Sequence, residues 1–353
     1  MASPLTVIGT VLTIEPASGD RSFDRTDAGD LKIVFSSGEH GVLARSHPRF
    51  QPIADFLASL VGDEVPVHAE LDGSGRFIRR LRLPLDVTVA DIRRLPNGDL
   101  DVVLMLSHAR HTLRAGNPRF AELAALLDAA RRDGGGLLVV ENDQQEITDA
   151  IRDPKFIVSR RADPIWIPPE SPPFAADVLS GAQLANAFAA VLTMRCEPSA
   201  APAPCIPFQF VGDGCHVRAD LMCHALAGTG VSAGKCWTYG DFHIPSASYP
   251  TCHVVWDWHV ATAVRLNTAQ GPETYVIDPS LFDQPVPLAR WLGRMAHPAP
   301  AAVITGPSRY YRLETGYEYP VDMKHRDRLA EYYRKQLRNQ TAESGVPPFA
   351  NCH

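Results

Sequence analysis

One cysteine in this sequence is placed where it can act as a nucleophile. Gly212 and Gly214 precede Cys215, and helix formers with helical apolar spacing follow it as far as Gly228, a suitable end signal. A helix here puts Cys215 in the first turn, where unpaired backbone N–H groups and the helix dipole favour an anion. We therefore expect a thiolate of lowered pKa, with N–H groups beside the glycines as oxyanion donors. The alternative is a buried structural cysteine at a helix start.

A histidine and an aspartate follow on a predicted hairpin. Residues 256–264 alternate as a strand, residues 275–278 form a second short strand, and a polar turn lies between them. With the tip of the hairpin directly after Thr268, His259 faces Asp278 at about 4.5–5.5 Å between Cβ atoms. The carboxylate then accepts from one imidazole nitrogen while the other nitrogen faces the thiol. The alternative is a core histidine and an aspartate that caps a turn.

Cysteine at a helix start, then histidine and aspartate on successive strands, is the order of the papain and transglutaminase group of enzymes. Three blocks carry a more specific resemblance to the bacterial protein-glutaminase (protein-glutamine deamidase) family. They are Asp213-Gly-Cys-His-Val-Arg-Ala-Asp-Leu-Met222, Trp256-Asp-Trp-His-Val-Ala261 and Ile277-Asp-Pro-Ser-Leu-Phe282. Smaller matches are Cys196, Cys205-Ile-Pro-Phe208, Tyr239-Gly240, Tyr310-Tyr-Arg312 and Cys352. The resemblance covers residues 174–353.

The resemblance implies an α+β, papain/transglutaminase-like domain that deamidates protein-bound glutamine to glutamate and releases ammonia. Cys215 would attack the carboxamide, His259 would transfer protons, and Asp278 would orient the imidazole, through a thioester. We expect no cofactor and no metal, a protein or peptide partner with an exposed glutamine, and a monomeric enzyme. Four aromatic residues are candidates to line the slot for the glutamine side chain, with core or rim positions as the alternative: Trp237, Tyr239, Trp256 and Trp258.

Other functions are compatible with the same residues. A transglutaminase would deliver the acyl group to a lysine amine, and a cysteine peptidase would cleave the backbone. A Cys/His metal-binding module is an alternative of another class. Its candidate ligands are Cys215-His216 and Cys223-His224, with His243, Cys252 and His253 beyond. The eight-residue step between the two pairs does not fit the close ligand spacing of ordinary zinc sites.

All seven cysteines lie in the second half of the chain. One interpretation is three disulfides and one working thiol, and the other is seven reduced thiols in a cytosolic protein. The clustering favours at least one disulfide, and the short Pro-rich loop between Cys196 and Cys205 makes that pair the favoured one. Together with the family resemblance this favours secretion, although Met1 to Thr10 has neither the basic start nor the apolar stretch of a signal peptide.

The first half contains an internal repeat. Residues 48–50 and 118–120 both read Pro-Arg-Phe, and each copy has alternating strands, a proline that opens a helix, and a further strand-like stretch. We therefore expect two related α+β modules at residues 1–82 and 83–158. In the family, an N-terminal pro-region blocks the active site until proteolysis, and residues 1–170 stand in that place. An inhibitory, targeting or substrate-recruiting role for them stays open.

A proline-rich stretch divides the two halves. Residues 163–173 contain five prolines, which favour extended conformation and cannot continue a helix. We expect a linker at residues 159–175, a helix over residues 176–192, and the catalytic domain at residues 176–353. The net charge of −6 argues against a nucleic-acid partner, and no apolar run approaches the roughly 20 residues that cross a bilayer.

Overall fold

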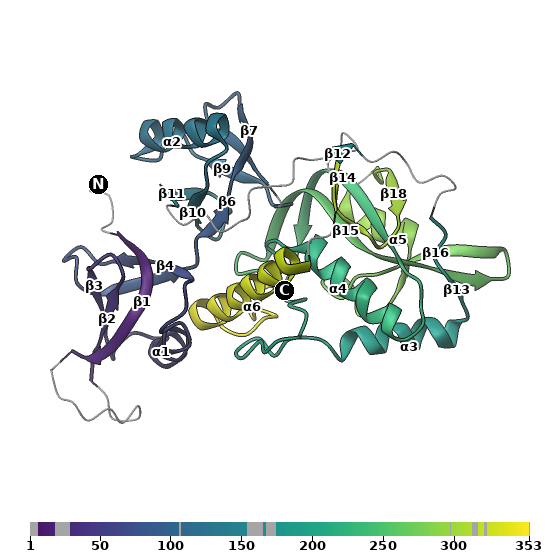
Figure 1. Cartoon of the computed structure of the whole chain (residues 1–353), viewed down its shortest axis with the longest axis horizontal. Helices are drawn as coiled ribbons and strands as arrows, with labels where there is room; N and C mark the ends of the chain where they lie inside the picture. Colours follow the sequence, from purple (N-terminus) through teal and green to yellow (C-terminus); the bar gives the residue numbers. More distant parts are fainter. Residues whose placement is uncertain are drawn as a thin grey trace. The chain divides into compact units, whose positions relative to one another are not determined.

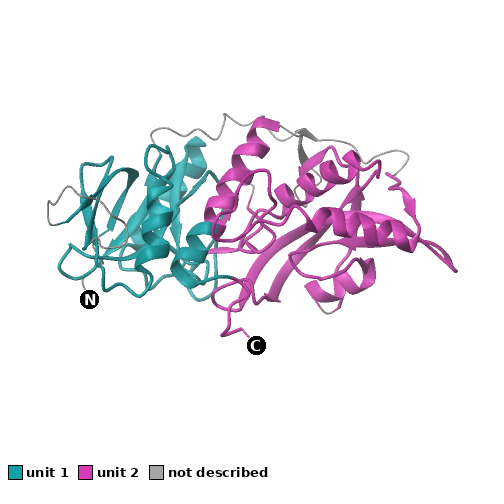
Figure 2. Ribbon diagram, turned by 90° about the horizontal axis from the view of Figure 1, so that it is seen from below, with its two compact units in different colours: residues 1–101, 112–156, 338–346 teal, residues 102–111, 157–337, 347–353 magenta. Residues whose placement is uncertain are grey.

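The computed structural model describes residues 6–17, 29–105, 107–153, 165–166, 174–296, 298–312, 317–320 and 323–352. It divides into two compact units, shown in Figure 2. Unit 1 comprises residues 1–101, 112–156 and 338–346, and unit 2 comprises residues 102–111, 157–337 and 347–353. A short stretch at 102–111, within the N-terminal half, therefore packs as part of the C-terminal unit. The fold contains both helices and sheets, as expected of an α+β protein.

The first part of the chain forms a five-stranded sheet of order β3–β2–β1–β4–β5. Its strands are β1 (Thr6–Pro16), β2 (Leu31–Phe35), β3 (His40–Leu43), β4 (Pro66–Leu71) and β5 (Ile78–Arg82). Helix α1 (Phe50–Ala58) buries its apolar side chains at three- and four-residue spacing, among them Phe50, Ile53 and Leu57.

Two three-stranded sheets and one helix follow. The strands are β6 (Leu85–Val87), β7 (Val89–Arg94), β8 (Leu100–Leu104), β9 (His111–Leu113), β10 (Leu137–Glu141) and β11 (Ile147–Arg152), in the orders β11–β10–β6 and β7–β8–β9. Helix α2 (Phe120–Asp133) lies between β9 and β10 in the chain.

The helices α1 and α2 begin at equivalent residues of the repeated motif, but the prolines of that motif, Pro48 and Pro118, lie outside them. Arg49 and Arg119 are the N-cap residues, and their backbone N–H groups donate to His47 Nδ1 and Asn117 Oδ1. These side-chain acceptors shape the turn that leads into each helix. The prediction that the proline opens the helix at an early position was therefore wrong by two residues, since α1 starts at Phe50 and α2 at Phe120.

Unit 2 is built on a six-stranded sheet, seen in Figure 1, of order β17–β16–β15–β14–β18, with β13 parallel to β15. Its strands are β13 (Val178–Leu179), β14 (Gly234–Pro245), β15 (His253–Thr268), β16 (Gly271–Ile277), β17 (Val286–Pro287) and β18 (Ala302–Thr305). A smaller sheet of order β12–β20–β19 contains β12 (Ile165–Trp166), β19 (Arg309–Arg312) and β20 (Tyr317–Pro320). The helices are α3 (Gly181–Leu192), α4 (Cys215–Gly228), α5 (Leu288–Met295) and α6 (Met323–Ser344).

Apolar clusters cover both faces of the large sheet. Val264 packs with Leu184 of α3 and Met222 of α4. Its neighbour Ala263 belongs to the cluster of Trp291 from α5. Successive strand residues point to opposite faces, so this alternation in β15 follows from sheet geometry. The central strands are consequently held on both sides.

Helix α3 starts later than the sequence suggested. Ser180 Oγ accepts from the backbone N–H of Gln183, and Gln183 Oε1 accepts from the N–H of Ser180, which forms a capping box. The predicted helix over residues 176–192 therefore begins only at Gly181, and the residues before it form β13. Of the linker predicted at residues 159–175, only β12 and residues 174–175 belong to the described residues.

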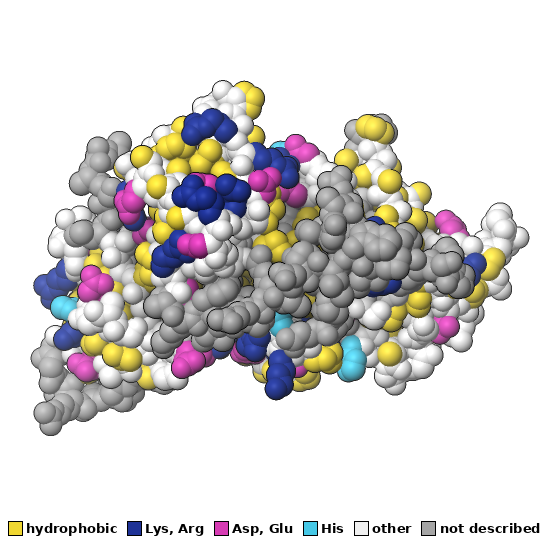
Figure 3. Space-filling view, turned by 45° about the horizontal axis from the view of Figure 1, so that its top comes forward, with side chains coloured by type: hydrophobic (Ala, Val, Ile, Leu, Met, Phe, Trp, Pro, Cys, Tyr) yellow, Lys and Arg dark blue, Asp and Glu magenta, His cyan; other side chains and the backbone are white. Residues whose placement is uncertain are grey.

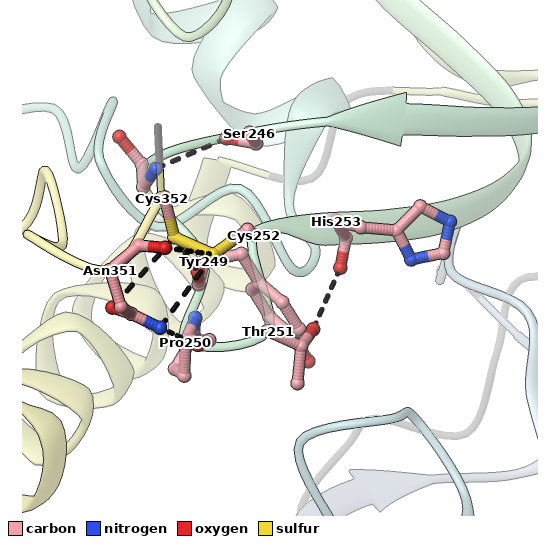
Figure 4. Close-up of a disulfide and its surroundings, with 9 residues drawn as sticks. Ser246, Tyr249, Pro250, Thr251, Cys252, His253, Asn351 and Cys352 are labelled. Atoms are coloured by element: carbon pink, nitrogen blue, oxygen red, sulfur yellow. Dashed lines mark hydrogen bonds between the residues drawn. A yellow bond between two sulfur atoms is a disulfide. The ribbon is translucent and has the colours of Figure 1, made fainter.

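Two disulfides are present, Cys196–Cys205 and Cys252–Cys352, and the other three cysteines are buried free thiols. The first confirms the favoured pairing. The second, shown in Figure 4, links the residue before β15 to the residue after Asn351, whose Nδ2 donates to the carbonyl of Pro250. Both sequence interpretations were wrong in number, since neither three disulfides nor seven reduced thiols occur.

Basic and acidic side chains are interspersed on the face of the molecule in Figure 3. Among the described residues, no helix combines the length and the apolar character that crossing a bilayer requires.

Candidate active site

Helix α4 places the candidate nucleophile. The helix begins at Cys215 and ends at Gly228, as predicted, with Gly214 as the N-cap in the left-handed region at φ 81°. A Cβ on Gly214 would lie 2.7 Å from the ring of Tyr333. Glycine is therefore required here both by conformation and by space, and it sets the position of Cys215.

His259 and Asp278 are in direct contact, although not by the predicted register. His259 Nε2 lies 2.9 Å from Asp278 Oδ2, and both residues are buried. Thr268 pairs with Gly271, so the hairpin tip lies one residue later than predicted and His259 and Asp278 are not directly opposite. The register differs by two residues along one strand, an even number that keeps both side chains on the same face. The carboxylate reaches the imidazole diagonally, from just beyond the end of β16.

Two tryptophans hold this pair in place. The ring of Trp256 stacks on His259 with centroids 4.6 Å apart, and the ring of Trp291 stacks at 5.6 Å. Trp291 Nε1 also donates to Asp278 Oδ2 at 2.9 Å. Burial alone would raise the pKa of Asp278, but the charge and hydrogen bond of His259 and the Trp291 hydrogen bond hold it below its usual range. Sequence reasoning missed Trp291, because nothing near it in the chain marks it as a partner of the aspartate.

Residues 107–110, here called the covering segment, lie against the same site within unit 2. The backbone N–H of Asp257 donates to His108 O, and the N–H of Arg110 donates to Val255 O. Ala109 forms an antiparallel bridge with Trp256. The covering segment is therefore paired with β15 as a short added strand, next to His259.

Side chains reinforce that pairing. Arg110 Nε and Nη2 both donate to Asp257 Oδ1, at 2.9 and 2.6 Å, and its Nη1 donates to Asp241. Trp258 Nε1 donates to Ser107 O. These contacts hold the covering segment at both of its ends.

His108 is the residue of the covering segment that enters the site. It is fully buried, its ring lies 5.8 Å from the ring of His259, and its Nδ1 lies 3.0 Å from Asp213 Oδ1. Burial lowers the pKa of His108 to about 4, despite the carboxylate. The imidazole is consequently neutral at neutral pH. Sequence reasoning assigned no role to His108, which is 107 positions before Cys215.

Cys215 does not have the lowered pKa expected at a helix start. It is only 1% exposed, and burial raises the pKa of its thiol well above the usual range, although the charge of Arg218 opposes this. Desolvation therefore outweighs the helix dipole at this position. The guanidinium of Arg218 is itself buried, and its Nη1 donates to the carbonyl of Phe210 at 2.7 Å.

The expected oxyanion donors are also partly engaged. The N–H of Gly214 donates to Asp213 Oδ1 at 2.6 Å, so it is not directed at the space beside the thiol. Gly214 allows the turn before the helix, as expected, but its N–H donates to Asp213 and is not available to a substrate oxygen.

The four aromatic residues predicted to line a substrate slot have different environments. Trp237 is fully buried and donates to Thr305 Oγ1, which makes it a core residue in this state. Tyr239 is half-buried, with its hydroxyl donating to Arg312 O. Trp256 stacks on His259, and Trp258 contacts the covering segment. Of the four, the last two lie at the site itself.

Among the described residues, the group of side chains that could hold a metal ion is His108, Cys215 and His259. The Cys/His set suggested by the eight-residue step is not brought together, and its Cys252 is oxidised in a disulfide. The metal-module interpretation of that set was therefore wrong.

A cysteine at a helix start, beside a histidine that hydrogen-bonds an aspartate, is the arrangement found in cysteine nucleophile enzymes. A protein-family model described as glutaminase matches residues 184–295, which include Cys215, His259 and Asp278. No curated protein matches the sequence.

Solved structures of protein-glutaminase share the fold. A mutant of pro-protein-glutaminase and pro-protein-glutaminase itself each match with a TM-score of 0.52, at 22% and 21% identity, over 76% of this chain and 98% and 97% of theirs. The structure of protein-glutaminase from Chryseobacterium proteolyticum matches at 27% identity over 50% of this chain and 94% of that one, with a TM-score of 0.39. The match to the glutaminase family model and the fold shared with pro-protein-glutaminase confirm the resemblance that the sequence motifs indicated.

Proposed function

We propose that this chain deamidates glutamine side chains of proteins, using Cys215 as nucleophile, His259 as acid and base, and Asp278 as the residue that orients the imidazole. The observation that carries the proposal is the buried contact between His259 and Asp278 beside a cysteine at the start of α4. The glutaminase family match over these residues supports amide hydrolysis as the class of reaction.

The proposed reaction has two stages. The Cys215 thiolate adds to the carboxamide carbon, protonated His259 gives its proton to the departing nitrogen, and ammonia leaves a thioester. His259 then takes a proton from water, the hydroxide adds to the thioester, and the thiolate leaves glutamate behind. Because His259 Nε2 contacts Asp278, Nδ1 is the nitrogen available for these transfers. The carboxylate stabilises the imidazolium that forms in each stage.

We further propose that residues 1–170 are an inhibitory pro-region and that the covering segment is its blocking part. The segment pairs with β15 as an extended peptide and inserts His108 beside the thiol, so it occupies the path that a substrate chain needs. The likeness to pro-protein-glutaminase extends over 76% of the chain, more than residues 174–353 supply, so it includes part of the first half. Cleavage within residues 163–173 is the proposed activating step.

The papain-like arrangement and the two repeated modules at residues 1–82 and 83–158 belong to the same proposal. A transglutaminase or a cysteine peptidase would use the same three residues, and the difference lies in what attacks the thioester or which amide is cleaved. The acceptor is therefore the point on which the experiment must discriminate.

Ammonia release from a glutamine-rich protein tests the proposal, with the intact chain, the chain after limited proteolysis, and a Cys215→Ala control. Each reaction is run with and without a primary amine, and Gln-to-Glu conversion is followed by mass. We expect ammonia and glutamate, a rise after proteolysis, and no product from Cys215→Ala. Mainly amine incorporation would establish a transglutaminase instead, and equal activity before and after cleavage would refute the pro-region. No ammonia from any form would refute the deamidase.

A further inference from the structure

Three buried metal-ligating atoms converge at the active site, and one comes from the covering segment. Cys215 Sγ and one ring nitrogen from each of His108 and His259 all lie within 4.8 Å of one another. None of the three residues is more than 1% exposed. The proposed reaction uses two of them and leaves His108 without a chemical role.

Each imidazole has a buried carboxylate close to one of its ring nitrogens. His259 Nε2 lies 2.9 Å from Asp278 Oδ2, and His108 Nδ1 lies 3.0 Å from Asp213 Oδ1. His259 Nδ1 and both ring nitrogens of His108 are buried and have no hydrogen-bond partner within the part of the chain that the structure describes. A histidine that hydrogen-bonds a carboxylate through one nitrogen and leaves the other free, as His259 does, is the arrangement that supports histidine ligands of zinc. His108 needs only a small ring adjustment to make the same bond to Asp213.

We propose that the intact chain binds a Zn²⁺ ion through His108, Cys215 and His259, and that the ion fastens the covering segment to the nucleophile. Zinc takes two nitrogen ligands and one thiolate readily, at about 2.0–2.1 and 2.3 Å, with water as the fourth ligand. Those bond lengths put ligand atoms roughly 3.5 Å apart in a tetrahedron, so the three side chains need shifts of about 1 Å. The Cys215 thiol loses its proton to solvent as the Zn–S bond forms.

The site couples metal binding to the proposed autoinhibition. Zinc on Cys215 and His259 blocks the two reacting groups, and His108 supplies the third bond only while the covering segment is in place. Release of residues 1–170 leaves two ligands and weakens the site. The link between zinc binding and inhibition rests on the proposed function, whereas zinc binding itself is tested independently of it.

Binding is measured on the intact, non-reduced chain with Zn²⁺ alone as the probe, in competition with a chromophoric chelator. Co²⁺ substitution reports the ligands, because a thiolate ligand adds a near-ultraviolet charge-transfer band. We expect one equivalent of zinc, a thiolate band, and a loss of affinity of more than about tenfold in His108→Ala. The matched control is His40→Ala, an exposed histidine at the start of β3, which should bind zinc like the unchanged chain.

Cys215→Ala gives a second test that does not depend on the folding of His108→Ala, and it should abolish the Co²⁺ thiolate band. Unchanged zinc affinity in folded His108→Ala, or cobalt bound without a thiolate band, would overturn the site. Binding as expected together with a cleaved chain that releases no ammonia would refute the proposed function and leave the metal site standing.

Discussion

The ion pair of Arg110 offers a direct test of what restrains the active site. Arg110→Ala removes the two hydrogen bonds to Asp257 and the one to Asp241, while the backbone pairing with β15 remains. The Asp257 contact is partly buried and has two N–H groups that donate to one carboxylate oxygen, so after allowance for solvent screening we assign it about 1–2 kcal/mol. Asp241 is 61% exposed and adds little.

That loss should appear as activity of the uncut chain. If only the open form turns over substrate, 1–2 kcal/mol raises the open fraction, and with it ammonia release, by about 5–30-fold. The assay is the initial rate of ammonia release from a glutamine-rich protein by uncut Arg110→Ala and by the unchanged chain. Arg114→Ala is the matched control, since Arg114 is also ion-paired, to Asp99 and Glu146, but lies outside the covering segment.

The same variants separate restraint from catalysis. After cleavage and removal of residues 1–170, all three proteins are the same enzyme and should have the same rate. A folded, uncut Arg110→Ala protein with the basal rate of the unchanged chain would refute the reasoning. An equal rise in Arg114→Ala would refute it as well, because the effect would then not come from the covering segment.

Three further outcomes are expected. Trp291→Phe keeps an aromatic ring, although a smaller one, and removes the N–H that donates to the Asp278 carboxylate, a bond worth about 1.5–3 kcal/mol. The kcat of the cleaved enzyme should therefore fall at least about tenfold with KM little changed, and an unchanged kcat would contradict this. Burial raises the pKa of Glu343 to about 7 from 4.5, so the folded state holds a proton that the unfolded state has lost between these values. The unfolding free energy of the unchanged chain should therefore fall by about 3 kcal/mol as pH rises through this window, and urea titrations should show a flatter dependence in Glu343→Gln. Cys352→Ser opens a disulfide that spans 100 residues and should lower the free energy of unfolding by about 4–5 kcal/mol. Cys205→Ser opens a disulfide that spans nine residues and should lower it by about 3 kcal/mol. Denaturant unfolding in which Cys205→Ser is the more destabilised variant would contradict the loop-length reasoning.

Local signals account for what could be predicted. The start of α4 at Cys215 followed from two glycines before a helical pattern, and its end followed from Gly228. The Cys196–Cys205 disulfide followed from a short loop that leaves the two residues close in any conformation. Each of these depends on residues near in the chain, where propensity and loop length decide the geometry.

Features between distant residues were predicted less well. The hairpin of β15 and β16 was expected, but its register was wrong by two residues, because a polar turn allows more than one tip. The error kept His259 and Asp278 on one face, since an even shift preserves the side of the sheet. The prediction of a lowered pKa for Cys215 was wrong because it took into account only the helix start. Burial of the thiol by the rest of unit 2 raises its pKa instead.

The sequence by itself determined which residues carry the candidate chemistry, because a nucleophile at a helix start and an alternating strand are local patterns. Only the tertiary structure decided their surroundings. It placed Trp291 behind Asp278 and His108 beside Cys215. Such contacts depend on the pairing of a free strand edge and on packing across a core, and any exposed backbone edge can accept many segments. Which segment pairs with this strand edge therefore depends on the packing of unit 2 as a whole, and the sequence around residues 107–110 does not reveal it.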